Sequence, residues 1–515
     1  MVKATTSGAT AQRPYSIAPQ GKDPYQYLAG FGNRFASEAI PGTLPYAQNS
    51  PQKCKYDLYA ESLNGTPFAM PRGQNQSTWI YRIRPSVAHQ GFTKLPDNPD
   101  VSPLQSRVKF LASQSEGPFQ PQQLAWYPHD LPSDNVKVDF VDGLKTIGGN
   151  GDPTLREGLA VHIYCANESM GNKAFCNGDG DFLILPEKSR LDIQTEFGKL
   201  TVRPGELAVI QRGIKYKIRA RRSHESYHRC YFRTALPEDA NILEIFGSHF
   251  ELPELGPLGT HGLANARDFE SPVASFDIDQ SPWESEHSTR MPGRYLGLTS
   301  GFHIAGWGKL FVCKQEHTPF DVVAWYGNYV PYKYAMEKFV NVGSISKDHI
   351  DPSIFCVLTA KSKTPGAPLA DFLIFSGRWD VANGTFRPPY YHRNCCTEMM
   401  GLIYGDYGGR SDAFAPGGFS YETGFCPHGV SYEEFKKATE GELQPMRVHE
   451  GTLAFMFESS MMVTLTDYAM KRTGKLHEHE PRMWDDLKGQ FMNHLDQINA
   501  DLKAAGLPEL GVKTE

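Results

Sequence analysis

The chain contains 515 residues, which is long enough for two or three domains whose cores need no disulfide bonds. Lysine and arginine number 52 against 58 aspartates and glutamates, and the formal net charge of −6 excludes the strongly basic surface of a nucleic-acid-binding protein. From this charge balance we expect small molecules and other copies of the chain as partners. No segment approaches the roughly 18 consecutive apolar residues of a membrane-spanning helix.

The first 24 residues are poor in apolar side chains and lack the apolar core of a secretory signal. Their composition favours a disordered tail over the alternative, a transit peptide. The nine cysteines include no CxxC pair, which is typical of reduced thiols and not of a disulfide framework. We therefore expect a cytoplasmic protein.

Residues 25–335 are predicted to form an N-terminal β-rich domain, because short apolar runs alternate there with Gly- and Pro-containing turns. The clearest stretch lies between residues 180 and 222, where turns recur about every 8 residues. We predict a meander rolled into a sandwich or barrel, with strands at Phe182–Leu185, Leu191–Thr195, Lys199–Val202, Leu207–Gln211 and Ile214–Ala220.

Basic residues alternate with apolar ones along the last of these strands. Lys215, Lys217 and Arg219 occupy every second position, which is the period of a strand with one polar face. The pattern favours a face exposed to solvent or to another subunit over an anion-binding stripe, since runs of charge usually meet water.

A second domain is predicted over residues 336–480, after a soft boundary near residues 328–336. Its segment 386–429 holds His392, His428 and several carboxylates in a frame rich in Gly and Pro. Two imidazoles and one carboxylate on one side of Fe(II) leave the opposite positions open for a substrate and O₂.

The distance between these side chains limits how they can bind one metal ion. His392 and Glu398 are about 20 Å apart along a straight strand at roughly 3.3 Å per residue. On a helix they would point about 120° apart. A shared metal therefore requires a turn near residues 394–397. Spacing alone is a weak signal, because a lone histidine is more often a hydrogen-bonded core residue than a ligand.

Few helices are expected. Ser431 and Glu434 have the spacing of a capping box and predict a short surface helix. In the last segment, residues 481–515, apolar residues recur at steps of three and four between Pro481 and Gly506. We predict an amphipathic helix that packs against the body or against a neighbouring subunit.

Long blocks of sequence resemble the homogentisate 1,2-dioxygenase family over nearly the whole chain, from about Tyr25 to about Leu487. Agreement of this extent is far more specific than a pattern of three residues. The blocks are YQYLAGFGNRFASEAIPGTLP, QKCKYDLYAESLNGTPFAMPR, DGDFLILP, TEFGKL, GPLGTHGLANARDF, FDVVAWYGNYVPYKY, DPSIFCVLTAK and FRPPYYHRNC.

The resemblance implies a mainly β, two-domain sandwich or jelly-roll (bicupin-like) fold with a few peripheral helices, whose first domain lacks metal ligands. It implies that His392, Glu398 and His428 bind Fe(II), that His428 also contacts substrate, that His349 is the catalytic histidine and that Tyr407 contacts substrate. The implied activity is opening of the homogentisate ring with O₂ to give 4-maleylacetoacetate in phenylalanine and tyrosine catabolism. The implied assembly is a homohexamer, a dimer of trimers.

The chain departs from the family at three positions near the expected site. Glu422 and Asp406 stand where histidines are expected, and Tyr404 stands where an arginine is expected. Loss of cationic or donor groups beside a carboxylate-bearing ligand weakens the case for homogentisate itself. The alternatives are a paralogous dioxygenase for another para-dihydroxy aromatic acid and a non-enzymatic bicupin protein. The retained ligand trio favours an enzyme over the latter.

Overall fold

The computed structural model describes residues 23–47, 52–96, 123–219, 238–254, 263–278, 301–306, 309–341, 352–380, 390–407, 414–442, 444–477 and 484–511. The predicted tail at 1–24 therefore lies almost entirely outside the described residues. Within the described ranges no helix is long and apolar enough to cross a membrane.

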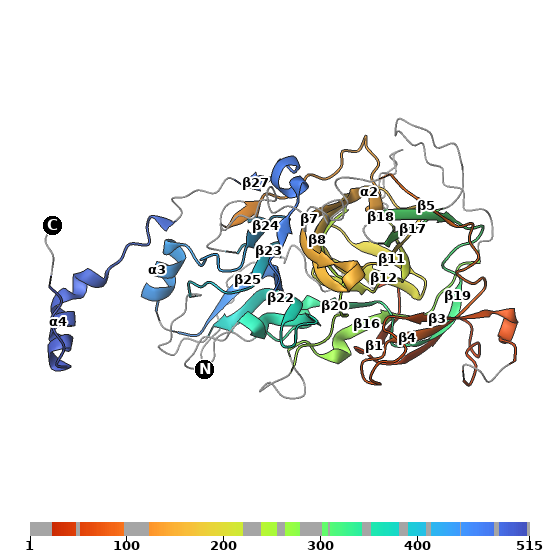
Figure 1. Ribbon diagram of the computed structural model, residues 1–515, viewed down its shortest axis with the longest axis horizontal. Coiled ribbons are helices and arrows are strands. Elements are labelled where there is room, and N and C mark those ends of the chain that lie inside the picture. The colour runs from red at the N-terminus through yellow and green to blue at the C-terminus, as the bar shows by residue number, and fades with distance from the viewer. Residues whose placement is uncertain are drawn as a thin grey trace, which may run out of the picture.

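The described residues form four β-sheets, which make up the body (Figure 1). The central sheet has the order β1 (Tyr27–Ala29), β16 (Phe269–Pro272), β20 (Tyr332–Ala335), β13 (Glu206–Ile210), β10 (Asp181–Pro186), β15 (Glu238–Ile245), β8 (Glu157–Ala166), β7 (Leu144–Asp152) and β26 (Thr464–Leu465). The outer sheet has the order β12 (Gly198–Val202), β11 (Leu191–Thr195), β14 (Lys215–Arg219), β9 (Ala174–Asn177), β17 (Gly301–Gly306), β18 (Lys309–Lys314) and β5 (Phe92–Lys94).

The small sheet has the order β2 (Phe35–Glu38), β19 (Val322–Gly327), β4 (Ser77–Arg82) and β3 (Tyr59–Asn64). The C-terminal sheet has the order β21 (Cys356–Lys361), β22 (Pro368–Asp380), β25 (Met446–Ser459), β23 (Thr397–Tyr404), β24 (Phe419–Glu422), β6 (Leu124–Trp126) and β27 (Leu476–His477). The described α-helices are α2 (Phe140–Gly143), α3 (Tyr432–Glu440) and α4 (Leu495–Ala504).

The central sheet is buried on both faces. All six residues of β10 are buried, and successive side chains of a strand point to opposite faces. Phe182 and Ile184 belong to the core cluster shared with the outer sheet. Leu183 and Leu185 belong to the cluster shared with the C-terminal sheet. The molecule is therefore layered outer–central–C-terminal, and the mainly β sandwich class predicted from the sequence is confirmed.

The five predicted strands between residues 180 and 222 are all present as β10 to β14, but the predicted meander is wrong. Only β11 and β12 pair as sequence neighbours, whereas β10 pairs with β13 and β15 in the other sheet. The chain thus alternates between the two sheets. Turn residues indicate where strands end, but they do not determine which strand pairs with which.

The predicted polar face of β14 is wrong for two of its three basic residues, whereas Arg219 is exposed as expected. Lys215 and Lys217 are only 7% and 6% exposed. The Lys215 ammonium donates to Ser86, and that of Lys217 lies 5.1 Å from the centre of the Phe320 ring. Lys215 and Lys217 are thus covered by segments that are distant in the sequence, which the sequence pattern could not show.

The two halves of the chain exchange strands. β6, which lies at residues 124–126, joins the C-terminal sheet by pairing with β24 and β27. β26, which lies at residues 464–465, joins the central sheet beside β7. The division predicted between residues 335 and 336 stays a prediction, and strands from each side of it complete the sheet of the other.

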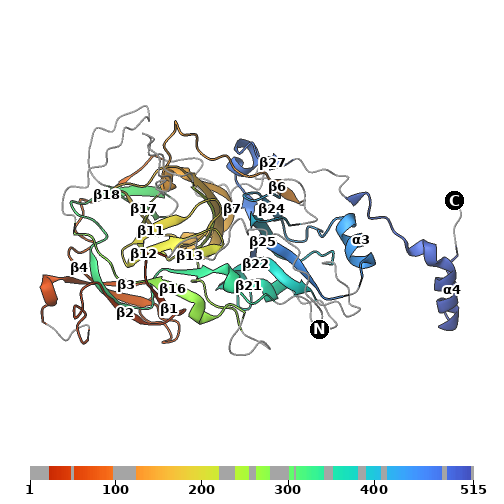
Figure 2. The same ribbon diagram turned by 180° about the vertical axis from the view of Figure 1, so that it is seen from behind.

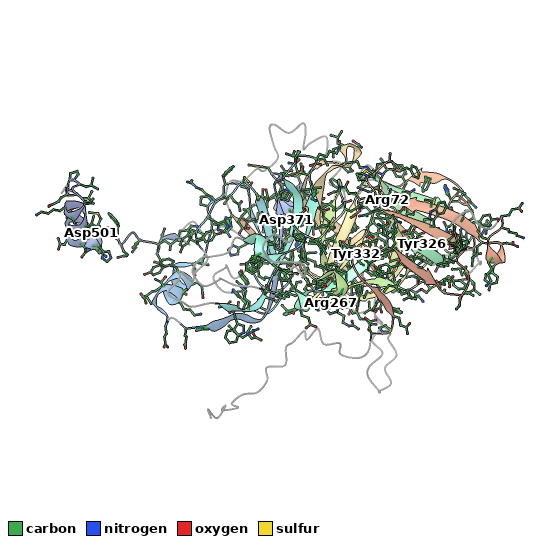
Figure 3. All side chains as sticks on the ribbon, turned by 90° about the horizontal axis from the view of Figure 1, so that it is seen from below. Arg72, Arg267, Tyr326, Tyr332, Asp371 and Asp501 are labelled. Atoms are coloured by element: carbon green, nitrogen blue, oxygen red, sulfur yellow. The ribbon has the colours of Figure 1, made fainter. Side chains whose placement is uncertain are left out.

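Both helix predictions can be compared with the structure. α3 begins after Ser431, whose hydroxyl accepts a hydrogen bond from the Glu434 N–H at 3.3 Å, which confirms the predicted cap. α4 begins at Leu495, after Gly489, later than the pattern from Pro481 suggested. It has no buried residue and lies apart from the body in two opposite views (Figures 1 and 2). Figure 3, in which Asp501 marks α4, shows the same separation. Packing against the body is therefore not observed.

Candidate metal centre

Two loops of the second half of the chain meet at the predicted ligand positions. His392 and His428 form an isolated antiparallel bridge, in which each backbone N–H donates to the other residue's carbonyl at 3.0 Å. Glu398 is the second residue of β23. Between His392 and Glu398 the chain turns at Asn394, whose side-chain oxygen accepts a hydrogen bond from the Cys396 N–H at 2.9 Å. The turn predicted near residues 394–397 is confirmed.

The three side chains converge. Their potential ligand atoms all lie within 4.8 Å of one another. His428 Nε2 is 3.3 Å from Glu398 Oε2, and His392 Nε2 is 3.6 Å from Glu398 Oε1. Ligand atoms that each lie about 2.1 Å from one ion are separated by about 3 to 4 Å, so these side chains can grip a single metal with small adjustments.

Backbone carbonyls set the orientation of both imidazoles. Nδ1 of His428 donates to the Cys426 carbonyl at 2.9 Å, and Nδ1 of His392 donates to the Tyr390 carbonyl at 3.2 Å. Because each Nδ1 then carries the proton, each Nε2 is free to bind a metal. The carboxylate of Glu398 is held in turn by the Asn394 amide at 2.7 Å. The sequence pointed to Asn394 only as part of the turn and not as a partner of Glu398, although its place four residues before Glu398 is the available signal.

Burial makes these interactions strong. Glu398 and His428 are 5% and 6% exposed, whereas His392 is half-buried. Burial alone would raise the pKa of Glu398, but its interactions with the neighbouring imidazoles of His392 and His428 outweigh burial and the pKa is lowered. The carboxyl group is therefore ionised, as a metal ligand must be.

Other carboxylates flank the trio. Glu422 on β24 and Glu458 on β25 are the register partners of Glu398 on its two neighbouring strands. Burial, together with the charges of Glu398 and Asp371, raises the pKa of Glu458 to about 7. Glu422 is buried and accepts hydrogen bonds from the Gln123 amide at 2.6 Å and the Ser420 hydroxyl at 3.2 Å. The first departure from the family pattern is thus one strand away from the candidate ligand.

Tyr407 lies on the same face of the C-terminal sheet as Glu398 but not beside it. The centres of the Tyr407 and Phe375 rings are 6.3 Å apart. Phe375 lies on β22, four residues after Asp371, and Asp371 is in register with Glu458 and, through it, with Glu398. Four strand residues correspond to roughly 13 Å. The apolar cluster that contains Leu373, Met400 and Met456 covers the sheet between them. His349 lies outside the described residues, and its catalytic role stays a prediction.

Of the three cysteines that flank the ligands in the sequence, only one is buried. Cys426 is buried, Cys396 is half-buried and Cys395 is exposed. Burial raises the pKa of the Cys426 thiol to about 11, which keeps it protonated and unreactive. All eight described cysteines are free thiols, as the sequence predicted.

We expect the affinity for Fe(II) to fall as the pH is lowered. Burial lowers the pKa of His428, but the hydrogen bond to Glu398 and the charge of Glu422 outweigh it and the pKa is raised. The protonated ring, which cannot bind metal, therefore persists to higher pH than in free imidazole, which titrates at about 6.5. Anaerobic equilibrium dialysis between about pH 8 and about pH 6 measures this. Constant affinity over that range would contradict it.

Two imidazoles and one carboxylate on one face of a β-sheet define a candidate mononuclear metal centre of the kind found in non-haem metalloenzymes. Family models described as homogentisate 1,2-dioxygenase N-terminal and C-terminal match residues 26–336 and 337–491. The chain therefore belongs to the homogentisate 1,2-dioxygenase family, a family of metal-dependent dioxygenases.

Individual relatives agree. Proteins from Mus musculus, Homo sapiens and Dictyostelium discoideum, each named homogentisate 1,2-dioxygenase, are 46%, 45% and 46% identical to this chain over 90% of its length and 97% of theirs. Among solved structures, a cupin 2 conserved barrel domain protein from Leptotrichia buccalis is 8% identical, covers 64% of this chain and 91% of its own, and has a TM-score of 0.24.

Proposed function

We propose that the chain is an Fe(II)-dependent dioxygenase that opens the ring of homogentisate with O₂, giving 4-maleylacetoacetate in phenylalanine and tyrosine catabolism. The observation that carries the proposal is the convergence of His392, Glu398 and His428 in a chain that matches the family along both of its domains. The reaction balances as homogentisate plus O₂, with both oxygen atoms retained in the product.

The chain's own residues have distinct roles in this proposal. His392, Glu398 and His428 hold the metal, and the carbonyls of residues 390 and 426 keep both Nε2 atoms turned toward it. When bound, ferrous iron supplies open positions at which a ring oxygen and O₂ can meet. His428 also contacts the ring, and His349 accepts the phenolic proton, since imidazole titrates near neutral pH.

Tyr407 is proposed to contact the polar arm of the substrate. Tyr407 lies roughly 13 Å along the strand direction from the position of Glu398. An aromatic ring with a short arm fits between these two positions. The apolar cluster between the two suits a flat ring. The hydroxyl of Tyr407 has no hydrogen-bond partner among the described residues, so it is available to the arm.

The direct test is oxygen uptake by protein loaded with Fe(II) under anaerobic conditions. We expect one O₂ consumed per homogentisate and the absorbance of a ring-opened product. If iron-loaded protein consumed no O₂ with homogentisate, the assignment of the substrate would be wrong. If the protein took up no iron, the whole proposal would be wrong.

A second candidate function is cleavage of another para-dihydroxy aromatic acid, such as gentisate. The buried carboxylate of Glu422 one strand from Glu398, and Asp406 next to Tyr407, favour it. A panel of substrates in the oxygen electrode separates the two candidates. The double variant with Glu422→His and Asp406→His should shift the preference toward homogentisate if these positions select the substrate.

We also propose that copies of the chain assemble, into the hexamer that the family resemblance implies. α4 has no buried residue, and Phe491 and Met492, just before it, are 61% and 55% exposed. Packing these two adjacent apolar side chains on another copy would remove their surface from water, which is favourable. We expect removal of residues 490–515 to lower the number of subunits per particle, calculated from the molar mass measured by size-exclusion chromatography with light scattering. An unchanged number of subunits would exclude α4 from the assembly.

A cytoplasmic location is proposed as well. The free thiols of all eight described cysteines support it, because unpaired cysteines are usual in reducing compartments. Fractionation of cells that express the full chain tests this directly.

A further inference from the structure

An unusual bulge interrupts β25 close to Tyr407. Ser376 of β22 pairs with Leu453, and Arg378 pairs with Val448, so the four residues 449–452 stand opposite Gly377 alone. Within the bulge, His449 has a φ of +53°, a left-handed conformation that few residues other than glycine adopt. A residue persists in such a conformation only when its surroundings hold it there.

Two residues of the bulge, Thr452 and His449, contact the segment 405–407. The Thr452 hydroxyl donates to the Asp406 carbonyl at 2.7 Å and accepts from the Asp406 N–H at 3.1 Å, which fixes the backbone. The His449 ring stacks on the Tyr407 ring, with 4.5 Å between centroids and an interplanar angle of 6°. Phe375 and Phe414 meet the Tyr407 ring edge-on at 6.3 Å and 6.0 Å.

These contacts determine the orientation of the Tyr407 ring. His449 covers one face, and the two phenylalanines pack against the ring in T-shaped geometry and limit its rotation. Burial, and then the charge of Arg378, lowers the pKa of His449 to about 4, so the stacked ring is uncharged near neutral pH. Parallel stacking with centroids 4.5 Å apart lies within the range that aromatic pairs favour.

We propose that His449 is a specificity-determining positioning residue, which holds the Tyr407 phenol so that its hydroxyl meets the polar arm of the aromatic substrate. The left-handed backbone of the bulge is what brings the imidazole face over the phenol. This inference rests on the proposed function, since the contact between Tyr407 and substrate belongs to it.

His449→Asn is the main test, because asparagine tolerates the left-handed backbone but has no ring to stack. We expect KM to rise between about 3-fold and about 10-fold, the scale of a lost aromatic pair, with kcat within about 2-fold of the parent. His449→Phe restores a flat ring and should recover most of the KM. Glu450→Gln, an exposed position in the same bulge, is the matched control and should leave KM unchanged.

Coupling with Tyr407 separates positioning from a general structural effect. Tyr407→Phe removes the hydroxyl, and adding His449→Asn to that variant should raise KM no further, because the stack then orients nothing that the substrate contacts. An unchanged KM in His449→Asn, or an equal rise in both backgrounds, would overturn the inference. If Tyr407→Phe leaves KM unchanged while the parent still turns over homogentisate, the inference and the proposed Tyr407 contact both fail, and the proposed ring-opening reaction stands.

Discussion

Replacing Glu398 by glutamine should abolish both metal binding and turnover. The carboxylate is 5% exposed, lies between the two candidate histidine ligands and is ionised, whereas a neutral amide is a poor ligand for a dication. The affinity for Fe(II) should fall by more than about 100-fold. That value is the upper end of the loss seen when a residue that only hydrogen-bonds to a metal ligand is removed, and loss of a ligand itself should cost more. Iron content after anaerobic loading and oxygen uptake measure the two effects.

The control for this variant is Glu433→Gln, an equal change of charge at an exposed position in the first turn of α3. It should load iron and turn over like the parent. If Glu398→Gln also kept its iron and its activity, the metal centre would have to lie elsewhere.

Replacing Arg82 by methionine should lower the free energy of unfolding more than any other substitution proposed for this protein. The guanidinium is fully buried and donates to Asp321 at 2.7 Å, to Glu196 at 3.1 Å and to Glu61 at 3.2 Å. Burial acts to lower its pKa, but the three carboxylates outweigh burial and raise it. Removing one partner of a buried ionic network costs about 3–5 kcal/mol, because the remaining charges stay buried and unpaired.

Urea unfolding monitored by circular dichroism measures this loss as a lower midpoint. Arg267→Met is the matched control, since the side chain of Arg267 is 75% exposed and its nearest carboxylate oxygen, on Asp268, is 3.9 Å away. A midpoint for Arg82→Met equal to that of Arg267→Met would show that the network adds nothing to stability.

Local features of the site can be predicted from the sequence. A turn is required near Asn394 because neither a strand nor a helix lets residues six apart share one ion, and the structure has an Asn394-centred turn there. Other local signals, such as the hydroxyl cap of α3 and the strands β10 to β14, are equally readable. Each depends on residues that are close in the chain.

Relations between distant residues are not readable in this way. Nothing near His449 in the sequence indicates that its ring stacks on a tyrosine 42 positions earlier, because that contact depends on the register of β22 with β25. The departures at Glu422 and Asp406 are visible as residue types, but their surroundings are not. Only the fold shows Glu422 beside Glu398 with Gln123 as its partner.

The sequence by itself determined the strand-rich class and the positions at which the chain turns, because periodicity and turn chemistry act over a few residues. The family followed from the resemblance of long sequence blocks. The tertiary structure alone decided which strands pair, that the central sheet is covered on both faces and that Lys215 is buried. The physical reason is that burial depends on which layer covers a strand, and here that layer comes from segments more than a hundred residues away, such as Ser86 against Lys215.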